Sequence, residues 1–454
     1  MTAPTAPSPS SNTPLFFQRR FLPMWIALAL GAFTDNMLKQ ALSIALVFGI
    51  LTAPFISNDD ALPLVGSLFP IAMLLFSTVA GQVADKYETA MMFRRTKFIE
   101  FLLMVLAAIG FMTGSTAILI LALFLMGAQS AFFSPTRTGA MPKYLEANEL
   151  VRGNALCSGG LFVSVMLGII VGGLFIAAPN GPMIVSAILV TAAFIGWFVI
   201  LRAPARPANA PDLKIDWNIF RQTVVLFGYA FKSRGVAHPV LGVAIYWLLG
   251  AFVSIAVPLF VRDTLGADET VVTVLMSLFA VGAAIGAAIA SSLSKGRSGL
   301  DFAFGAVAIA SIATLLVFTL SLGTAPLTSD TLRNVGTYFV DTRSFTIAAA
   351  FLVASTGMSV FAVPLMAAVQ RRAPTDKRSR ILAANNMMNG AGAIIGSWLV
   401  LSITRTSISA AYVFLAVGLM QLAIAIYMYI RRARVPSGLY DEVLENTADV
   451  AAPS

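Results

Sequence analysis

The sequence predicts an all-α membrane protein with twelve transmembrane helices, arranged as two six-helix halves with both termini in the cytoplasm. Its residues are 58% hydrophobic and only 11% charged, whereas soluble domains have about 25% charged residues. Its mean hydropathy is +0.85, and apolar runs of about 20 residues, the length of a membrane-spanning helix, recur along the chain. Lysine and arginine gather in alternate connections between these runs, as the positive-inside rule requires.

The apolar runs form two groups of six around a hydrophilic connection. We expect six-helix bundles at 21–201 and 237–430, joined by a cytoplasmic linker at 202–236. Residues 1–20 are expected to be a disordered cytoplasmic N-terminus, and residues 431–454 a cytoplasmic tail. Within the linker, residues 214–221 fit either an amphipathic surface helix or a plain connection. The expected spans are approximately 21–51, 62–83, 96–112, 116–133, 153–177, 183–201, 239–261, 269–293, 300–322, 345–368, 380–403 and 409–430.

The distribution of basic residues predicts the orientation of the chain. With both termini inside, 25 of the 30 lysines and arginines fall on the cytoplasmic side. Apart from Lys39, those on or near the other side are Arg262, Arg333, Arg343 and Arg405. The reversed topology would contradict the positive-inside rule, so membrane orientation, and not nucleic-acid binding, explains the net charge of +9.

The chain has one histidine, His238, and one cysteine, Cys157. A single cysteine excludes an intramolecular disulfide and a cysteine metal cluster. His238 precedes Pro239 at the start of an apolar run, and we interpret it as a helix-end residue. Because metal sites and nucleophilic catalysis usually need several such groups, the sequence predicts no enzyme, no cofactor and no metal.

The middle of the first expected span contains the polar sequence Asp35-Asn36-Met37-Leu38-Lys39. Asp35 and Lys39 are four residues apart, so a helix places them on the same face. A charge at that depth costs about 2.5–3.5 kcal/mol on insertion scales, and it should face a wet or protein-lined interior with a partner. We interpret the pair as the floor of a substrate cavity; the alternative is a buried ion pair that only locks two helices together.

Six plus six spans around a central connection are typical of transporters built from two repeated halves. Between the second and third spans, Gly81, Asp85 and Lys86 followed by Arg94 and Arg95 fit the pattern G-x-x-x-D-[RK] with a basic pair. This pattern resembles the motif of the major facilitator superfamily, and the resemblance implies that these five residues take part in conformational gating. An acid at a helix end can pair with a basic group on a neighbouring helix in one conformation and release it in another.

Further stretches resemble the bacterial lysophospholipid transporters of that superfamily, which include forms fused to an acyltransferase and an acyl-carrier-protein ligase. The fused enzyme domains have no counterpart in this sequence, and Arg137 with Thr138 replaces the usual lysine and aromatic residue. The stretches that carry the resemblance span nearly the whole apolar chain: Gly31 to Asn36 with Lys39, Lys97 to Glu100, Ser134 to Arg137, Leu150 to Leu156, Leu265 to Glu269, Val363 to Leu365, and Arg380 to Asn386 with Asn389.

The resemblance implies transport of a lysophospholipid, such as lysophosphatidylethanolamine or lysophosphatidylglycerol, to the cytoplasmic leaflet of the bacterial inner membrane by alternating access. A separate acyltransferase would then re-acylate it. Asn386 and Asn389, three residues apart, are expected on one helical face, and Arg137 is expected to hold a phosphate, to form a gating ion pair or to anchor a helix. The expected head-group residues are Asp35, Asn36, Lys39, Glu100, Arg137, Asn385, Asn386 and Asn389. The acyl chain needs an apolar slot, which phenylalanine and methionine can line.

Two other functions remain open at the level of sequence. The same fold could export amphipathic drugs or metabolites, with Asp35 as the acid that couples transport to protons. A non-transporting membrane scaffold for a lipid acyltransferase is the second alternative.

Overall fold

The computed structural model describes residues 14–434 except 54–55, 147–148, 219–220, 222, 226–227, 229–235, 294–299, 323–331, 374–377 and 407. The described chain is helical almost throughout, and its β-structure is limited to an isolated bridge between Ala267 and Arg333. Most of the expected N-terminal and C-terminal segments, residues 1–13 and 435–454, lie outside the described residues.

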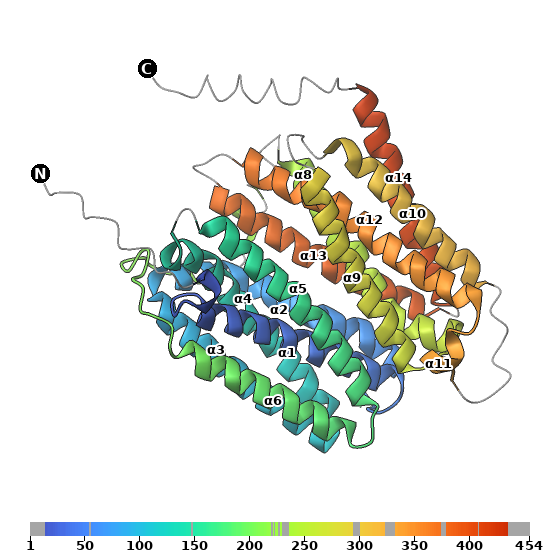
Figure 1. Cartoon of the computed structure of the whole chain (residues 1–454), viewed down its shortest axis with the longest axis horizontal. Coiled ribbons are helices and arrows are strands. Elements are labelled where there is room, and N and C mark those ends of the chain that lie inside the picture. The colour runs from blue at the N-terminus through green and yellow to red at the C-terminus, as the bar shows by residue number, and fades with distance from the viewer. Residues whose placement is uncertain are drawn as a thin grey trace, which may run out of the picture. The chain divides into compact units, whose positions relative to one another are not determined.

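The helices belong to two compact units (Figure 1). The first unit, Met1–Asn58 and Leu68–Val224, begins with a short 3₁₀ turn, Leu15–Phe17. The second unit consists of Asp59–Ser67 and Val225–Ser454. The helices of the first half of the chain are α1 (Leu22–Val47), α2 (Asn58–Lys86), α3 (Thr89–Thr113), α4 (Thr116–Tyr144), α5 (Leu150–Ile176) and α6 (Gly181–Ile200). Those of the second half are α8 (Ala237–Leu259) with a π-helical turn (Phe260–Thr264), α9 (Glu269–Leu293), α10 (Leu300–Ser321), the short α11 (Val335–Tyr338), α12 (Thr342–Arg372), α13 (Arg378–Thr404) and α14 (Ala411–Arg434).

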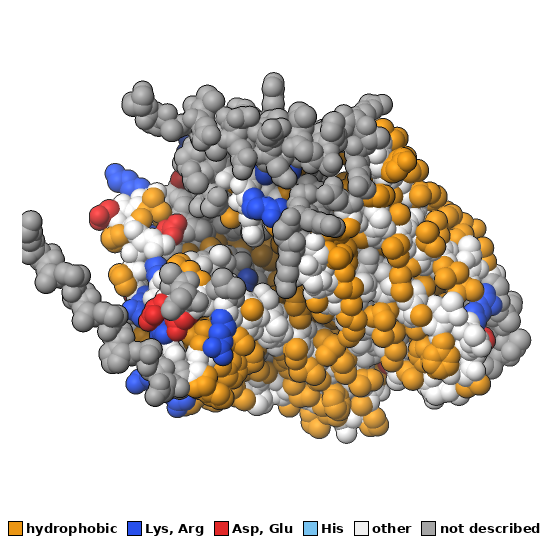
Figure 2. All heavy atoms as spheres, turned by 45° about the horizontal axis from the view of Figure 1, so that its top comes forward, with side chains coloured by type: hydrophobic (Ala, Val, Ile, Leu, Met, Phe, Trp, Pro, Cys, Tyr) orange, Lys and Arg blue, Asp and Glu red, His pale blue; other side chains and the backbone are white. Residues whose placement is uncertain are grey.

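The prediction of an all-α membrane protein with twelve long helices is confirmed. Eleven of the described helices are long and apolar enough to cross a membrane. The twelfth, α1, has 26 residues, which is sufficient length, and its polar middle lowers its hydropathy. Large hydrophobic side chains are exposed on the outward faces of the helices, for example Phe98 and Leu102 of α3, and Figure 2 shows such side chains spread widely over the surface. This is the surface expected of helices surrounded by lipid.

Four helix pairs recur in both units. In the first unit α1 packs against α5 and α6, and α3 packs against α4 and α6. In the second unit α8 packs against α13 and α14, and α10 packs against α12 and α14. Counted along each half, these are the same pairs: the first long helix with the fifth and sixth, and the third with the fourth and sixth. Such repetition is typical of transporters with internal structural repeats.

Closely spaced glycines bring the first and fifth helices of each unit together. A Cβ atom at Gly172 of α5 would lie 2.5 Å from the Met37 carbonyl oxygen of α1, and one at Gly396 of α13 would lie 2.3 Å from the Leu248 carbonyl oxygen of α8. Each helix has a second such glycine four residues earlier, Gly168 and Gly392 respectively. Small residues at this spacing let two helix backbones approach closely within a membrane.

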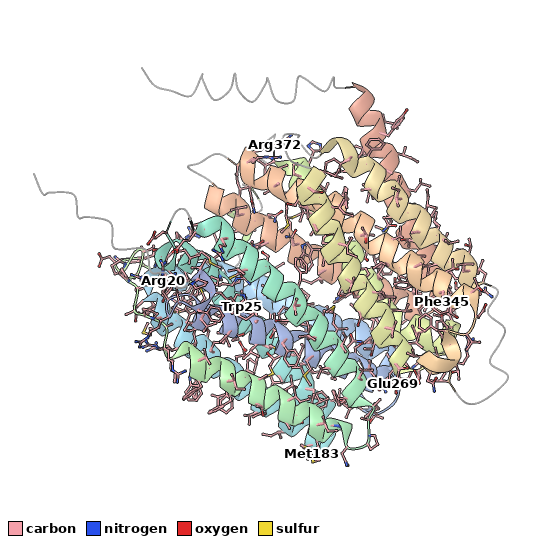
Figure 3. All side chains as sticks on the ribbon, viewed as in Figure 1. Arg20, Trp25, Met183, Glu269, Phe345 and Arg372 are labelled. Atoms are coloured by element: carbon pink, nitrogen blue, oxygen red, sulfur yellow. The ribbon has the colours of Figure 1, made fainter. Side chains whose placement is uncertain are left out.

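The start of α1 is fixed by polar contacts as well as by packing. Arg20 and Trp25, both labelled in Figure 3, lie at this end of the helix. The Arg20 guanidinium pairs with Glu149 at 2.7 Å, and the Trp25 indole donates a hydrogen bond of 2.9 Å to the Leu156 carbonyl oxygen of α5. The expected cytoplasmic anchor before the first span is therefore also bonded to the residues at the start of α5.

The fourth span is longer than expected. It was predicted to end near Phe133, with Ser134 to Arg137 in a polar connector, but α4 continues to Tyr144 with Pro135 and Pro142 inside it. Prolines are tolerated in membrane helices where side chains and neighbouring helices satisfy the freed backbone groups. In this part of α4 the hydroxyl groups of Thr136 and Thr138 donate to carbonyl oxygens four residues earlier.

In the linker, residues 214–218 form no helix, while residues 219, 220 and 222 lie outside the described residues.

We predict that Gly172→Ala destabilises the protein, because the new methyl group would push α1 and α5 apart. Overpacking of this kind costs about 1–3 kcal/mol. The measurement is thermal unfolding of the detergent-purified protein, followed by tryptophan fluorescence. Gly159→Ala in the same helix is the control, since no atom lies within 4 Å of a Cβ built there. Equal unfolding temperatures for the two variants would contradict the prediction.

Candidate functional site

Asp35 lies in the middle of α1 and makes its recorded hydrogen bond across to α4. The Ser130 hydroxyl donates to Asp35 Oδ2 over 3.3 Å. The other carboxylate oxygen, Oδ1, is buried and has no hydrogen-bond partner among the described residues. A buried polar atom without a partner is uncommon in native structures and requires an explanation. Asp35 therefore has an acceptor available for a ligand, a water molecule or a proton.

Helix α3 has a buried ion pair of its own, Lys97 with Glu100. Lys97 Nζ is 2.9 and 2.7 Å from the two carboxylate oxygens of Glu100, and the two side chains are 0% and 3% exposed. Gln129 of α4 donates from Nε2 to Glu100 Oε2 at 3.2 Å and to the Thr96 carbonyl oxygen at 3.1 Å. Paired and hydrogen-bonded in this way, both charges can remain in a membrane interior.

These contacts form one chain of polar side chains through three helices of the first unit. Ser130 lies next to Gln129 in sequence, and its hydroxyl is also 3.4 Å from Gln129 Oε1. Its single hydrogen can be donated to Asp35 Oδ2 or to Gln129 Oε1, so Ser130 lies between the Asp35 contact and the Glu100 contact. The ammonium group of Lys97 also lies 4.6 Å from the centre of the Phe133 ring, a cation–π distance. We call this chain the polar network; its members are Asp35, Lys97, Glu100, Gln129 and Ser130.

Gly31 explains how α1 can lie against the buried ion pair. A Cβ atom at Gly31 would be 2.4 Å from Lys97 Nζ and 3.3 Å from Glu100 Oε1. Gly31 therefore leaves the space that the Lys97–Glu100 pair occupies. Gly31 lies one turn before Asp35 on α1, and it contacts the Lys97–Glu100 pair of α3. Both sequence stretches are among those that resemble the lysophospholipid transporters.

The two charges of α1 take different partners. Lys39 Nζ lies 3.4 Å from the centre of the Phe69 ring of α2, and within the described part of the chain the structure records no ion pair between Lys39 and Asp35. The Asn36 amide donates to the Ala32 carbonyl oxygen of its own helix at 2.8 Å. Asn36 and Lys39 thus lie beside the polar network without hydrogen bonds that join them to it.

The expected amides of the second half are on α13, but a different pair shares the buried face. Asn385 and Asn389 are 4% and 8% exposed, and the Oδ1 atom of each is buried without a hydrogen-bond partner among the described residues. Asn386, which we expected to act with Asn389, is exposed. Residues four apart on a helix lie as close in rotation as residues three apart, so burial against the neighbouring helices decides which asparagine joins Asn389.

Arg137 is half-buried inside α4 and not in a connector at the membrane boundary. Within the described residues no hydrogen bond or ion pair joins it to the polar network. No group of three or more histidine, cysteine, aspartate and glutamate side chains in the described chain is placed to hold a metal ion.

The expected gating motif is in contact with the linker. Asp85 Oδ1 accepts a hydrogen bond of 2.8 Å from the Asn209 amide, and its carbonyl oxygen accepts one of 2.9 Å from the Ala210 N–H. Gln82 Oε1 accepts from the Asp216 N–H at 2.7 Å. Among the described residues no ion pair of Asp85 with a basic side chain is recorded, and its carboxylate accepts from the linker amide instead.

Side chains from three helix ends bind the same segment, residues 203–216, which we call the strap. Arg94 donates to the Ala203 carbonyl oxygen at 3.1 Å, Tyr144 to that of Pro204 at 2.6 Å, and Lys143 to that of Pro207 at 2.8 Å. We did not predict this role of the strap from the sequence. The sequence feature that could have indicated it is the prolines of the strap, because prolines prevent a regular helix and leave carbonyl oxygens free to accept hydrogen bonds from side chains. Of the other motif residues, Lys86 is half-buried, Arg95 is exposed and Gly81 has open space around its Cα.

Within the second unit, two of the arginines expected on the non-cytoplasmic side have acidic partners at the start of α2. Arg262 pairs with Asp59 at 3.0 Å and with its neighbour Asp263 at 2.6 Å. Arg405 lies 3.9 Å from Asp60. Asp59 and Asp60, which we expected in a short loop at 53–61 after the first span, lie in the first turn of α2 and supply the acidic partners of these two basic residues.

Twelve long helices in two units that share four helix pairs are the architecture typical of transporters built from internal repeats. The family model of the Major Facilitator Superfamily matches residues 24–340 and 239–448. The chain belongs to this family.

Two curated relatives are similar over part of their length. The lysophospholipid transporter LplT of Photorhabdus laumondii is 27% identical over 268 residues, which are 58% of this chain and 63% of that protein. LplT of Salmonella arizonae is 26% identical over 277 residues, 59% of this chain and 64% of that protein. The chain therefore matches a little under two thirds of the length of these relatives.

Solved structures share the fold at low sequence identity. A POT family transporter in complex with a thioalcohol conjugated peptide has a TM-score of 0.66 at 12% identity, covering 90% of this chain and 96% of that one. The nucleoside transporter NupG has a TM-score of 0.63 at 13% identity, covering 91% and 99%. A bacterial homologue of the iron transporter ferroportin has a TM-score of 0.61 at 15% identity, covering 90% and 99%.

We predict that Lys97→Met lowers the free energy of unfolding by about 3–5 kcal/mol, because it leaves the Glu100 carboxylate buried without its counter-ion. The double variant Lys97→Met with Glu100→Gln should recover most of this loss, since neither charge then remains alone and Gln129 keeps a hydrogen-bond partner. Thermal unfolding of the purified proteins in detergent measures both. If the single and the double variant are equally unstable, the ion pair is not what stabilises this region.

We also predict that Gln82→Ala loosens the strap. The substitution removes both recorded hydrogen bonds between Gln82 and Asp216, and at about 0.5–1.5 kcal/mol each this should raise the rate of trypsin cleavage after Lys214 by roughly tenfold. Asn154→Ala is the matched control, because this exposed amide bonds only to a carbonyl oxygen of its own helix. Cleavage at the wild-type rate in Gln82→Ala would show that the strap does not depend on these bonds.

Proposed function

We propose that the protein is a secondary transporter that moves a lysophospholipid to the cytoplasmic leaflet of a bacterial inner membrane. Two observations support the substrate class: the similarity to the LplT proteins, and the kind of charge in the membrane interior. The network that contains Asp35 carries both signs of charge together with an amide and a hydroxyl group. A lysophospholipid head group is zwitterionic or anionic and can exchange its hydration shell for such partners.

The observation that carries the proposal is the unpartnered Oδ1 atom of Asp35 inside a network in which the other charges are paired. A carboxylate that only stabilised the fold would be expected to have both oxygens satisfied. We propose that Asp35 accepts from the ammonium group of lysophosphatidylethanolamine or from the hydroxyl groups of lysophosphatidylglycerol. Lys39, whose ammonium group lies over the Phe69 ring, would exchange this cation–π contact for the phosphate.

The other expected binding residues keep subordinate roles in the proposal. Asn385 and Asn389, whose buried Oδ1 atoms lack partners, are candidate contacts to the head group from the second half. Asn36, Glu100 and Arg137 would tune the charge around the substrate. Exposed Asn386 is the weakest candidate for contact with the substrate.

Alternating access belongs to the proposal as well. The two bundles, 21–201 and 237–430, would rock against each other around the substrate, with the linker and both termini in the cytoplasm. The motif of Gly81, Asp85, Lys86, Arg94 and Arg95 would gate this motion, and release of Asp85 from Asn209 would be one step of it. A separate acyltransferase would consume the transported lipid.

The first test is uptake of labelled lysophosphatidylethanolamine into spheroplasts of cells that lack their own transporter. Wild-type protein should support uptake. Asp35→Asn, which can still accept from Ser130, should fold but lose the charge-assisted contact to the substrate, which is worth about 1.5–3 kcal/mol, roughly a tenfold to hundredfold loss of uptake. Asp212→Asn in the exposed linker is the control and should behave as wild type.

Failure of folded, membrane-inserted wild-type protein to take up any lysophospholipid would overturn the proposal. The export of other amphipathic molecules would then be the function to test, by a substrate-dependent proton signal that disappears in Asp35→Asn. Normal uptake by Asp35→Asn would instead remove Asp35 from the substrate site.

A further inference from the structure

The outward faces of α3 and α6 meet in a cluster of aromatic rings. The two helices pack side by side in the first unit (Figure 1). The centre of the Trp197 ring of α6 lies 5.1 Å from that of Phe98 and 5.9 Å from that of Phe101, both on α3. Phe194 of α6 lies 5.7 Å from the Phe101 ring and 6.2 Å from the Phe198 ring. We call these five rings the aromatic patch; its members are Phe98, Phe101, Phe194, Trp197 and Phe198.

The aromatic patch faces outward from the first unit. Phe98, Phe194 and Phe198 are 41%, 43% and 48% exposed. Rings that served only to join α3 to α6 would be expected to be buried between the two helices. The exposed rings, held in place by their contacts with one another, instead offer a fixed apolar surface with which a hydrocarbon chain can make many van der Waals contacts.

Two exposed arginines lie at one end of the aromatic patch. Arg95 is in the second turn of α3, and Arg202 follows the end of α6 with its guanidinium carbon 5.2 Å from the centre of the Phe198 ring. A hydrogen bond of 3.1 Å between their sequence neighbours, from Arg94 to the Ala203 carbonyl oxygen, holds the two helix ends together. Arg95 and Arg202 therefore lie at the same surface of the membrane, which the distribution of basic residues predicts to be the cytoplasmic one.

These two guanidinium groups have no counter-ion. Within the described residues no ion pair or hydrogen bond of the Arg95 or Arg202 side chain is recorded. The sequences of α3 and α6 contain a single acidic residue, Glu100, which is buried and paired with Lys97. Since the guanidinium fork matches the oxygens of a phosphate group, and lipid phosphates lie where helices leave the hydrocarbon, the charge at this end of the patch complements a phospholipid head group.

We propose that this face of α3 and α6 binds an anionic diacyl phospholipid of the adjacent leaflet, with its phosphate at Arg95 and Arg202 and an acyl chain across the aromatic patch. From Arg95 to Phe101 a helix rises about 9 Å, and the hydrocarbon of one leaflet is about 15 Å thick. The rings therefore flank the first part of a chain whose head group lies at the arginines. The site belongs to the first unit alone, and it does not depend on which molecule the protein transports.

The first experiment tests the charge. The full-length protein in mild detergent is mixed with equal amounts of phosphatidylglycerol and phosphatidylethanolamine that have the same acyl chains, and native mass spectrometry measures which lipid stays bound. Wild type should prefer the anionic phosphatidylglycerol by roughly twentyfold, about fivefold for each arginine near the head group. The double variant Arg95→Gln with Arg202→Gln should bind the two lipids equally. Arg152→Gln is the control and should keep the preference, since Arg152 is also exposed but lies at the start of α5.

The second experiment tests the rings. Phe98→Ala should lower the affinity for phosphatidylglycerol about fivefold, the effect of losing the apolar contact of one half-exposed ring. It should keep the preference for phosphatidylglycerol over phosphatidylethanolamine, because both arginines remain. Phe162→Ala on α5 is the matched control: Phe162 is also 41% exposed, and within the described residues it has no recorded ring contact. Its affinity should equal that of wild type.

A third experiment locates the lipid. Phosphatidylglycerol with a photoactivatable group in its acyl chain is added to the full-length protein in lipid nanodiscs, and the labelled peptides are identified by mass spectrometry. Labelling should fall on residues 98–101 of α3 and 194–198 of α6, and the double arginine variant should lose it.

Several results would overturn the inference. Equal binding of the two lipids by wild type, or an equal loss of preference in Arg152→Gln, would show that the two arginines select no head group. Labelling away from α3 and α6 would place the lipid elsewhere. If the protein is a dimer in which α3 and α6 are shielded from the probe, this face is an interface between two copies and not a lipid site. Loss of lysophospholipid uptake with unchanged labelling would reject the proposed function and leave this site standing.

Discussion

The cost of placing charge in a membrane interior governs the first unit. Each unpaired charge at the centre of a membrane helix costs about 2.5–3.5 kcal/mol on insertion scales, so Lys97 and Glu100 must neutralise each other wherever they are buried. Their pairing on α3, with Gln129 of α4 as a further donor, requires α1 to approach without a side chain at Gly31. The position of α1, and with it the position of Asp35, depends on that buried pair.

The same requirement of close approach appears in the apolar packing. Pairs of glycines on α5 and α13 bring these helices against the backbones of α1 and α8 at corresponding places in the two units. Between helices in a membrane, contact area and van der Waals packing replace the hydrophobic effect as the source of association. A repeated fold can therefore keep these helix pairs while a buried charged network lies in one of its two halves.

The strap ties the linker to the ends of three helices of the first unit. Its prolines leave carbonyl oxygens that Arg94, Tyr144 and Lys143 reach from the ends of α3 and α4, and its Asn209 amide takes the carboxylate of Asp85. From the sequence we expected Asp85 to pair with a basic group on a neighbouring helix. In this structure Asp85, at the end of α2, contacts the linker instead. Any change that moves the linker then changes the partners of Asp85.

The fold and parts of the site follow from sequence to different extents. The second-half span expected at 269–293 coincides with α9, whereas the fourth expected span, 116–133, stops well before the end of α4 at Tyr144. Hydropathy is summed over neighbouring residues, so it locates spans well and their ends less well. The asparagines of α13 show the same limit: spacing alone does not tell which of Asn385 and Asn386 is buried with Asn389.

By itself the sequence determined that the chain crosses a membrane as two groups of six helices, and that charges stand at Asp35, Lys39, Lys97 and Glu100. These properties depend on the composition of short stretches, so they can be read from about 20 consecutive residues at a time. Only the tertiary structure decided which groups are partners: Asp35 with Ser130, Lys39 with the Phe69 ring, and Lys97 with Glu100 and Gln129. Partners on different helices depend on how closely the backbones approach, and that distance is set by small residues such as Gly31 and Gly172. A hydropathy pattern does not show which helix such a glycine faces.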